Sequence, residues 1–193
     1  MKRNSLILIV VAILLLMVGC NGYNGLVTLD QDAKSQWGQV ENQYQRRADL
    51  IPNLVNTVKG VANFEQSTLT AVINARASAT QIKVDPANLT PEKLQEFQAA
   101  QGQLSQALGR LMVVSEQYPE LKANQNFLEL QSQLEGTENR ITVARQDFNN
   151  SVQKFNTKAK SFPTNLMACM FGFPEKGFFT AAEGSDKVPE VKF

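Results

Sequence analysis

Glu135 and Glu138 stand three residues apart, and Arg140 and Arg145 follow them within seven residues. Residues three or four apart share one face of a helix, and paired carboxylates inside a helical bundle can bind metal ions or transfer protons. Bundle sites that hold two metals typically add Glu-x-x-His pairs, and the chain contains no histidine. We therefore interpret these side chains as ion pairs along the helix surface, each contributing about 0.3–0.5 kcal/mol.

Other kinds of catalytic site have little support in the composition. The absence of histidine removes the commonest general base and the commonest zinc ligand. The two cysteines, Cys20 and Cys169, are too few for a disulfide framework or a four-thiolate metal site. No nucleophile motif stands out, and a serine–lysine pair would need a spatial adjacency that sequence does not reveal. We expect no catalytic, cofactor-binding or metal-binding residues.

The charges are balanced along the chain. Of the 19 basic side chains, Lys2 and Arg3 precede the first apolar run, and the first acid is Asp30. The remainder carries 17 basic and 18 acidic side chains, a formal charge of −1. Nucleic-acid-binding proteins usually present a basic face, so we expect no nucleic-acid partner.

The first 22 residues read as a membrane-targeting segment. Lys2 and Arg3 precede residues 6–19, which contain no polar side chain. This charge arrangement predicts a cytoplasmic amino terminus and export of the remainder. The run of 14 residues is short for a bilayer, which needs ~20, but residues 4–23 would just suffice, with Tyr23 at an interface.

Two interpretations of this segment remain open. One is an uncleaved signal-anchor helix. The other is a lipoprotein signal peptide, because residues 16–20 (LMVGC) resemble a lipobox with Cys20 as the lipidated residue. Met17 stands where leucine is typical of that motif. Both interpretations tether the rest of the chain to membrane lipid.

The helices that follow are predicted from apolar spacing. The first runs to about Ala48, with Leu26, Ala33, Trp37, Val40 and Tyr44 on its inner face. In RRADLIPNL (residues 46–54), Asp49 is a good N-cap and Pro52 fits the first turn of a helix. We therefore expect a corner between Ala48 and Leu50, with Arg46 and Arg47 in the favourable last turn of the first helix. A kink in one continuous helix is the structural alternative. A ligand site at the two arginines is the functional alternative, and we favour the structural role, which accounts for every residue of the motif.

The second and third helices have clear boundaries. The second is expected to reach about Gln81, with Leu54, Val58, Val61, Leu69 and Val72 facing inward and Gly60 inside it. Residues 84–93 are a loop in which Thr90 caps a helix that begins at Pro91. The third helix runs to about Tyr118, with Leu94, Phe97, Leu104, Leu108 and Leu111 inward and Gln98, Gln101, Gln103 and Gln106 on the outer face.

A fourth helix, over residues 124–162, shows the longest periodic pattern. Six apolar residues recur at steps of seven: Phe127, Leu134, Ile141, Phe148, Phe155 and Phe162. Such heptads predict a long helix packed in near-coiled-coil fashion. Phenylalanines at this spacing are typical of a bundle core.

The end of the chain divides into two parts. Residues 164–182 are an apolar segment that contains a short helix, and residues 183–193 are a polar tail expected to be disordered. The segment from Leu166 to Phe179 either caps the open end of the bundle or dips its side chains into the membrane interface. Cys169, within it, is expected to be buried as a small apolar residue.

Much of the chain after residue 22 resembles the LemA family of bacterial membrane-anchored proteins. The resemblance rests on Tyr23-Asn24-Gly25-Leu26-Val27, Trp37 with Val40, residues 44–55 (YQRRADLIPNLV), Tyr118-Pro119 with residues 121–124 (LKAN), residues 134–141 (LEGTENRI) with Ala144-Arg145, Phe162-Pro163 with Asn165, and Gly172-Phe173. It implies an amino-terminal membrane segment followed by an antiparallel helical bundle, and it brings no reaction and no catalytic residues. Some members of the family look like lipoproteins and many carry a plain anchor helix, so both interpretations of Cys20 stay open.

Together these features predict an all-α protein. We expect an antiparallel up-and-down four-helix bundle at residues 23–163, preceded by a membrane segment at residues 1–22. We expect the bundle on the extracytoplasmic side of a membrane, and a role as a scaffold or interaction protein, with an unidentified envelope protein as partner, in envelope homeostasis. The alternative is a hydrolytic or metal-dependent envelope enzyme that uses the carboxylates of the bundle.

Overall fold

The computed structural model describes residues 2–61 and 64–180. Among the first 18 residues it describes the side chains of Asn4, Ile7, Ile9, Val10, Ile13, Leu14 and Met17. The predicted tail at residues 183–193 lies outside the described residues, as do most side chains of the predicted membrane segment.

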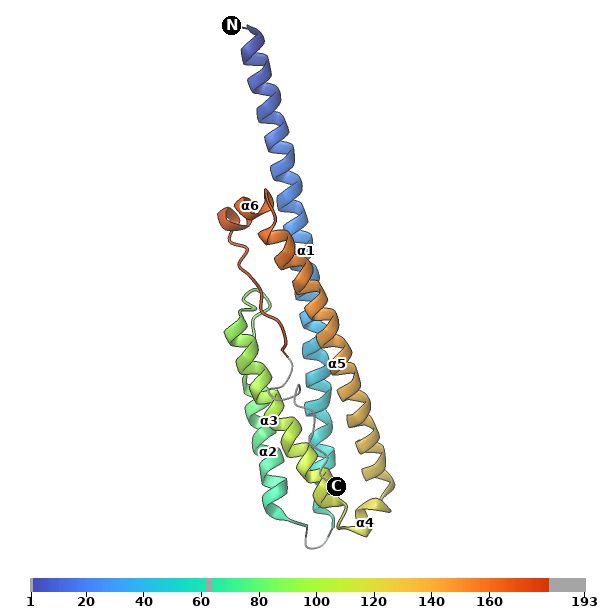
Figure 1. Cartoon of the computed structure of the whole chain (residues 1–193). Coiled ribbons are helices and arrows are strands. Elements are labelled where there is room, and N and C mark those ends of the chain that lie inside the picture. The colour runs from blue at the N-terminus through green and yellow to red at the C-terminus, as the bar shows by residue number, and fades with distance from the viewer. Residues whose placement is uncertain (1, 62–63, 181–193) are drawn as a thin grey trace, which may run out of the picture.

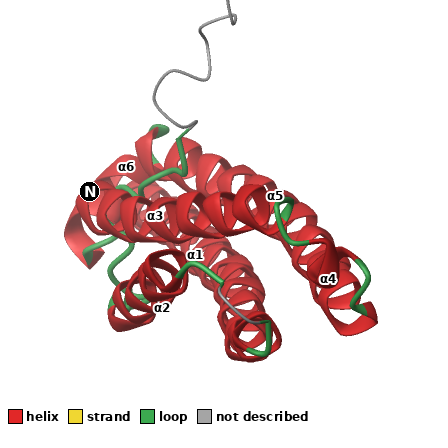
Figure 2. Ribbon diagram, turned by 90° about the horizontal axis from the view of Figure 1, so that it is seen from below, coloured by secondary structure: helices red, strands yellow, loops and turns green. Residues whose placement is uncertain are grey.

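The described chain is all-helical, as the sequence predicts. Its helices are α1 (Lys2–Lys59), α2 (Gln66–Gln81), α3 (Pro91–Ser115), α4 (Pro119–Lys122), α5 (Gln125–Lys160) and α6 (Thr164–Phe171). No strand occurs in residues 2–61 or 64–180. Figure 2 shows these helices from one end of the molecule.

The long helices lie side by side and alternate in direction (Figure 1). Helix α1 packs mainly along α5, and α2 packs mainly along α3. The short α6 follows α5 and lies beside α1, and α1 extends beyond it (Figure 1). One end of the bundle therefore carries α6 and the protruding start of α1, whereas the connection between α1 and α2 lies at the opposite end.

The expected corner between Ala48 and Leu50 is wrong. Helix α1 continues through Pro52 to Lys59, and the next helix begins at Gln66. Proline has no N–H, so Pro52 leaves the Ala48 carbonyl, four residues earlier, without its usual helical donor. Arg76 of α2 supplies one instead, because its Nε donates to the Ala48 oxygen at 2.8 Å. The neighbouring helix thus offsets part of the cost of the proline.

The predicted starts of the third and fourth helices are confirmed. The Thr90 side chain accepts a hydrogen bond from the Lys93 N–H at 3.4 Å, and Pro91 follows it as the first helical residue. The Asn124 side chain accepts from the backbone of Asn126 and Phe127 at the start of α5. Each cap satisfies amide groups that the first turn of a helix leaves unpaired.

The predicted inner faces form the core, with few exceptions. The inward residues of the first and third predicted helices are all buried, and of the second only Val61 is half-exposed. Five of the six heptad residues are buried, but Phe162 is 81% exposed. It lies two residues beyond the end of α5, so the helical period no longer sets its direction. Gln101 is buried rather than on the outer face.

The predicted membrane segment enters the structure as the first part of α1. Among the described residues, no helix combines the length and the apolar character that a bilayer crossing requires.

Candidate functional site

Among the residues that the structure describes, the most buried charged side chain lies in the middle of the bundle. Arg47 of α1 is only 2% exposed. Its Nη1 donates to the Ser105 hydroxyl and to Glu138 Oε2, both at 2.8 Å. Its Nη2 donates to the Gln101 side-chain oxygen at 2.7 Å and to the Gln101 carbonyl at 3.3 Å. We call Tyr44, Arg47, Gln101, Ser105 and Glu138 the Arg47 cluster.

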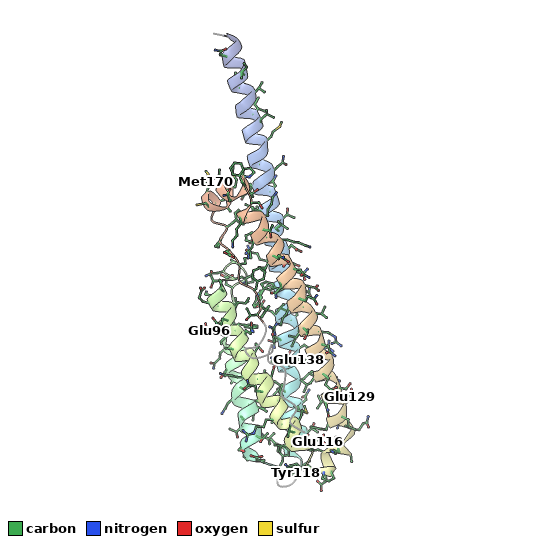
Figure 3. All side chains as sticks on the ribbon, in the orientation of Figure 1. Glu96, Glu116, Tyr118, Glu129, Glu138 and Met170 are labelled. Carbon is green, nitrogen blue, oxygen red and sulfur yellow. The ribbon has the colours of Figure 1, made fainter. Side chains whose placement is uncertain are left out.

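This cluster joins three helices through one guanidinium. Arg47 comes from α1, Gln101 and Ser105 from α3, and Glu138 from α5. Figure 3 shows Glu138 partway along α5, on the stretch beside α1. The Arg47 guanidinium also lies 5.1 Å from the centre of the Tyr44 ring, a distance suited to a cation–π contact. A buried charge is costly unless it is paired and hydrogen-bonded. These contacts pair the charge and satisfy both terminal nitrogens of Arg47, whereas its buried Nε has no hydrogen-bond partner among the described residues.

The sequence-based interpretation of these charges is wrong in two respects. Arg47 does not sit in the last turn of a helix, since α1 continues to Lys59. Glu138 pairs with Arg47 across the bundle rather than along its own helix, and Glu135 accepts a hydrogen bond from Gln131. Arg46 is exposed. The sequence brings the two arginines together, but only one of them enters the bundle.

A groove of about 500 Å³ lies beside the cluster. Its lining includes Glu41, Tyr44 and Gln101, together with Lys83 and Asp85 from the loop between α2 and α3. Burial raises the pKa of the Glu41 carboxyl above its ordinary value. Burial also raises the pKa of the Tyr44 phenol. The groove therefore offers polar recognition of a ligand, without a nucleophile and base in contact among its lining residues.

A second polar arrangement holds the end of the described chain. Residues 173–180, which we call the strap, follow α6 and run back along the bundle in extended form (Figure 1). Within the strap, Lys176 is 4% exposed, and its Nζ lies 2.7 Å from Asp30 Oδ1 on α1. The same Nζ is 4.7 Å from the centre of the Phe155 ring on α5. Asp30 also pairs with Lys34 at 2.7 Å.

The backbone of the strap is gripped by side-chain amides. Asn156 accepts from the Lys176 N–H at 3.0 Å and donates to the Lys176 carbonyl at 2.8 Å. Asn149 does the same to Phe179, with both distances at 2.9 Å. Gln98 of α3 repeats the arrangement at Thr180. Each amide thus replaces the two hydrogen bonds that a neighbouring strand would make.

The spacing of the two asparagines matches the strap. Seven residues of helix rise about 10.5 Å at ~1.5 Å each. Three residues of extended chain cover about 10 Å at ~3.4 Å each. Asn149 and Asn156 are seven apart on α5, and Phe179 and Lys176 are three apart on the strap. The two sets of groups therefore meet in register. The sequence offered one signal of this, because the asparagines repeat at the same step as Phe148 and Phe155.

The strap also completes the core. The Phe179 ring stacks on Trp37 at 6.0 Å and meets Phe148 edge-on at 5.5 Å. The Arg145 guanidinium lies over the Phe179 ring, 4.7 Å from its centre, and donates to the Thr180 carbonyl at 3.0 Å. The prediction that Leu166–Phe179 acts as one segment therefore does not hold. Phe179 packs in the bundle core, whereas α6 lies at the end of the bundle.

The two cysteines are free and exposed. The expected burial of Cys169 is wrong, because within α6 it is Thr164 and Ala168 that face the bundle. Cys20 lies on α1, and its predicted lipidation stays a prediction. In the described part of the chain, no group of three or more Cys, Asp or Glu side chains is placed to hold a metal ion.

The sequence model of the LemA family matches residues 36–193. The chain belongs to the LemA family. That match includes the Arg47 cluster, α6 and the strap.

Two kinds of relative accompany this family match. The chain is 27% identical to magnetosome protein MamQ 2 of Paramagnetospirillum magneticum, over 85% of this chain and 66% of the relative. It is 27% identical to MamQ of Magnetospirillum gryphiswaldense over the same shares. It is 25% identical to protein LemA of Metamycoplasma hominis, over 83% of this chain and 69% of the relative. The chain thus spans just under two thirds of the length of the MamQ relatives.

Proposed function

We propose that this LemA-family protein is a membrane-tethered, four-helix scaffold that presents a rigid bundle to a protein partner in the cell envelope. The bundle lies on the extracytoplasmic side, and the amino terminus is cytoplasmic if the segment at residues 1–22 is retained. Catalysis is no part of this role.

The continuity of α1 carries the proposal. This single helix of 58 residues contains the apolar run at its start and the buried residues Leu26, Trp37 and Leu54 further along. At ~1.5 Å per residue it is roughly 87 Å long. A tether and a core element that belong to one helix hold the bundle at a fixed height, which a flexible linker would not do.

The surface between α1 and α5 supports binding of a protein. One open groove of about 380 Å³ is lined by Gln36, Gln39 and Gln43 of α1 together with Asn139 of α5. A second, of about 430 Å³, is lined by further amides, among them Asn53, Asn56, Asn126 and Gln133. In the first groove, Gln43 Oε1 is buried and has no hydrogen-bond partner among the described residues. A buried acceptor without a donor is costly, so a partner that draws the Gln43 side chain outward to a donor of its own would relieve that cost.

The strap gives a precedent within the same molecule for amides as protein-binding groups. Asn149, Asn156 and Gln98 each hold one residue of extended chain through two hydrogen bonds. Side-chain amides on the α1–α5 face can engage a partner's backbone in the same manner.

Two measurements test the scaffold role. Membranes from cells that make the full-length chain are washed with high salt and alkaline carbonate, and we expect the chain to stay in the pellet. A photo-crosslinker at Gln39 is then expected to capture the same envelope protein repeatedly, and Gln43→Ala with Asn139→Ala should reduce the yield. Asn74→Ala on α2 is the matched control. Recovery of the chain in the wash would overturn the proposal. So would turnover of any compound in a substrate panel, if Glu138→Gln abolished that turnover.

A further inference from the structure

The outer face of α6 is unusually apolar for a surface helix. Leu166, Met170 and Phe171 are each more than half exposed, with Met170 at 75%, and Phe162 precedes them. Leu166 and Met170 lie four residues apart on α6, about one helical turn, and Phe162 precedes the helix by two residues. Single exposed apolar residues are ordinary, but a contiguous group of large ones marks an interaction surface. We call these four residues the α6 platform.

The α6 platform and its neighbouring residues pack against the apolar part of α1. The Tyr23 ring lies 4.9 Å from the Phe171 ring and 5.9 Å from the Phe173 ring, both edge-on. A Cβ at Gly19 would lie 3.1 Å from the end of the Met167 side chain, and one at Gly22 would lie 3.8 Å from Thr164. The small residues of α1 thus let α6 approach closely.

The surroundings of the platform favour an apolar medium. Residues 161–174 carry no charged side chain, and neither do residues 4–29 of α1. Beyond the contact with α6, α1 exposes Ile7, Ile9, Val10, Ile13, Leu14 and Met17. Figures 1 and 3 show α1 continuing past α6, with Met170 at this end of the bundle. The exposed apolar side chains of the two helices therefore gather at the same end.

The shape of the surface distinguishes lipid from a folded partner. All four side chains of the platform are more than half exposed. The platform therefore projects outward as separate side chains. Protein partners usually bind such anchors in complementary hollows, whereas fluid acyl chains adapt to any projecting side chain. Lys154 and Lys158 lie on the adjacent turns of α5, where lysines can reach lipid headgroups.

We propose that the α6 platform lies in the boundary between headgroups and acyl chains, beside α1, and holds the bundle upright on the membrane. This inference rests on the membrane tether of the proposed function. Helices with one apolar face bind at this depth, about 5–10 Å below the headgroup surface. A second contact with the bilayer restricts tilting of the bundle about α1.

Photo-crosslinking in native membranes tests this directly. The full-length chain carries p-benzoylphenylalanine at position 170, or at position 113 as a control. Val113 is an apolar residue on α3 that is 69% exposed, close to the 75% of Met170. We expect lipid adducts, measured by intact mass, at position 170 and on the order of tenfold fewer at position 113, because burial of one large apolar side chain changes partition by about that factor.

A variant of the platform supplies the second measurement. Leu166→Gln and Met170→Gln change exposed side chains and leave the contact between Tyr23 and Phe171 in place, so circular dichroism should be unchanged. We expect this double variant to lose lipid adducts from p-benzoylphenylalanine placed at position 162.

The outcomes separate the two proposals. A membrane-bound chain that gives no lipid adduct at position 170, or gives a protein adduct there, overturns the platform and leaves the scaffold role intact. A chain that does not remain with membranes at all overturns both.

Discussion

Arg76 donates its Nε hydrogen to the carbonyl oxygen of Ala48, 28 residues earlier in the chain, at 2.8 Å. That carbonyl is the one that Pro52 deprives of its helical donor. The proline inside α1 and the arginine on α2 therefore act as a pair, and neither can be understood from its own helix.

This pairing predicts a double-mutant cycle. Arg76→Ala should destabilise the protein by about 1–3 kcal/mol, because it leaves the Ala48 carbonyl without a donor. In a Pro52→Ala background the same change should cost less, since the new N–H at position 52 supplies the hydrogen bond. Urea unfolding of the four proteins gives the coupling energy, expected on the order of 1 kcal/mol. Simple additivity of the two changes would contradict the assignment.

Loss of Glu138 should be more damaging than loss of an ordinary surface acid. Glu138 is half-exposed, but its partner Arg47 is buried, so Glu138→Ala leaves a buried cation without its counter-charge. We expect a loss of about 2–4 kcal/mol in unfolding free energy. Glu129 on the same helix, which accepts from Gln133, is the control, and Glu129→Ala should cost well under 1 kcal/mol. Equal effects of the two changes would argue against the pairing.

The amide grip on the strap is testable by proteolysis. Lys176 is buried in the native protein, so trypsin should cleave after it only when the strap leaves the bundle. Asn149→Ala combined with Asn156→Ala should accelerate cleavage at this bond by more than tenfold, because each asparagine makes two hydrogen bonds worth about 0.5–1.5 kcal/mol each. Asn150→Ala, at an exposed position between them, should leave the rate unchanged. Resistance of the double variant would show that other contacts hold the strap.

Acid should loosen the strap through Asp30. Burial by itself would raise the pKa of Asp30, but hydrogen bonds and charge from Lys176 and Lys34 outweigh it and leave the pKa below its ordinary value. A lowered native pKa stabilises the folded state above the unfolded pKa of about 4 and ceases to do so as the pH falls through the native value.

The unfolding free energy should therefore decline from about pH 5 to pH 3, and Asp30→Asn should flatten that decline. Asp32→Asn, two residues further along α1, serves as the control. Parallel pH profiles for wild type and Asp30→Asn would contradict the role given to the pair with Lys176.

Two glycines should respond in opposite directions to alanine. A Cβ at Gly177 would lie 2.7 Å from Pro91 Cα, which is backbone and cannot move aside, so Gly177→Ala should destabilise the strap by about 1–3 kcal/mol. A Cβ at Gly102, inside α3, would meet nothing within 4 Å. Gly102→Ala should therefore stabilise the protein by up to about 1 kcal/mol. Thermal unfolding of both variants tests the contrast, and a neutral Gly177→Ala would mean that the strap does not pack on Pro91.

The spacing of apolar residues predicted the buried faces of the helices, but the sequence did not predict the hydrogen-bond partners of the buried polar side chains. The step of seven from Phe127 to Phe155 predicts the buried face of α5, because a helix repeats that face at a nearly constant interval. Pro52 misled the prediction, since the donor that offsets it comes from a different helix. The hydrogen-bonding roles of Arg47, Lys176 and Asn156 depend on which helices become neighbours, and spacing along one helix does not report this.

The matched steps of α5 and the strap also limit how the chain can vary in length. A residue inserted between Lys176 and Phe179 would displace one of them by ~3.4 Å along an extended chain, beyond the reach of a short asparagine side chain. Only one anchor could then remain engaged, unless a bulge absorbed the extra residue. Binding of the strap by both asparagines thus requires a fixed number of residues between Lys176 and Phe179, as well as the asparagines themselves.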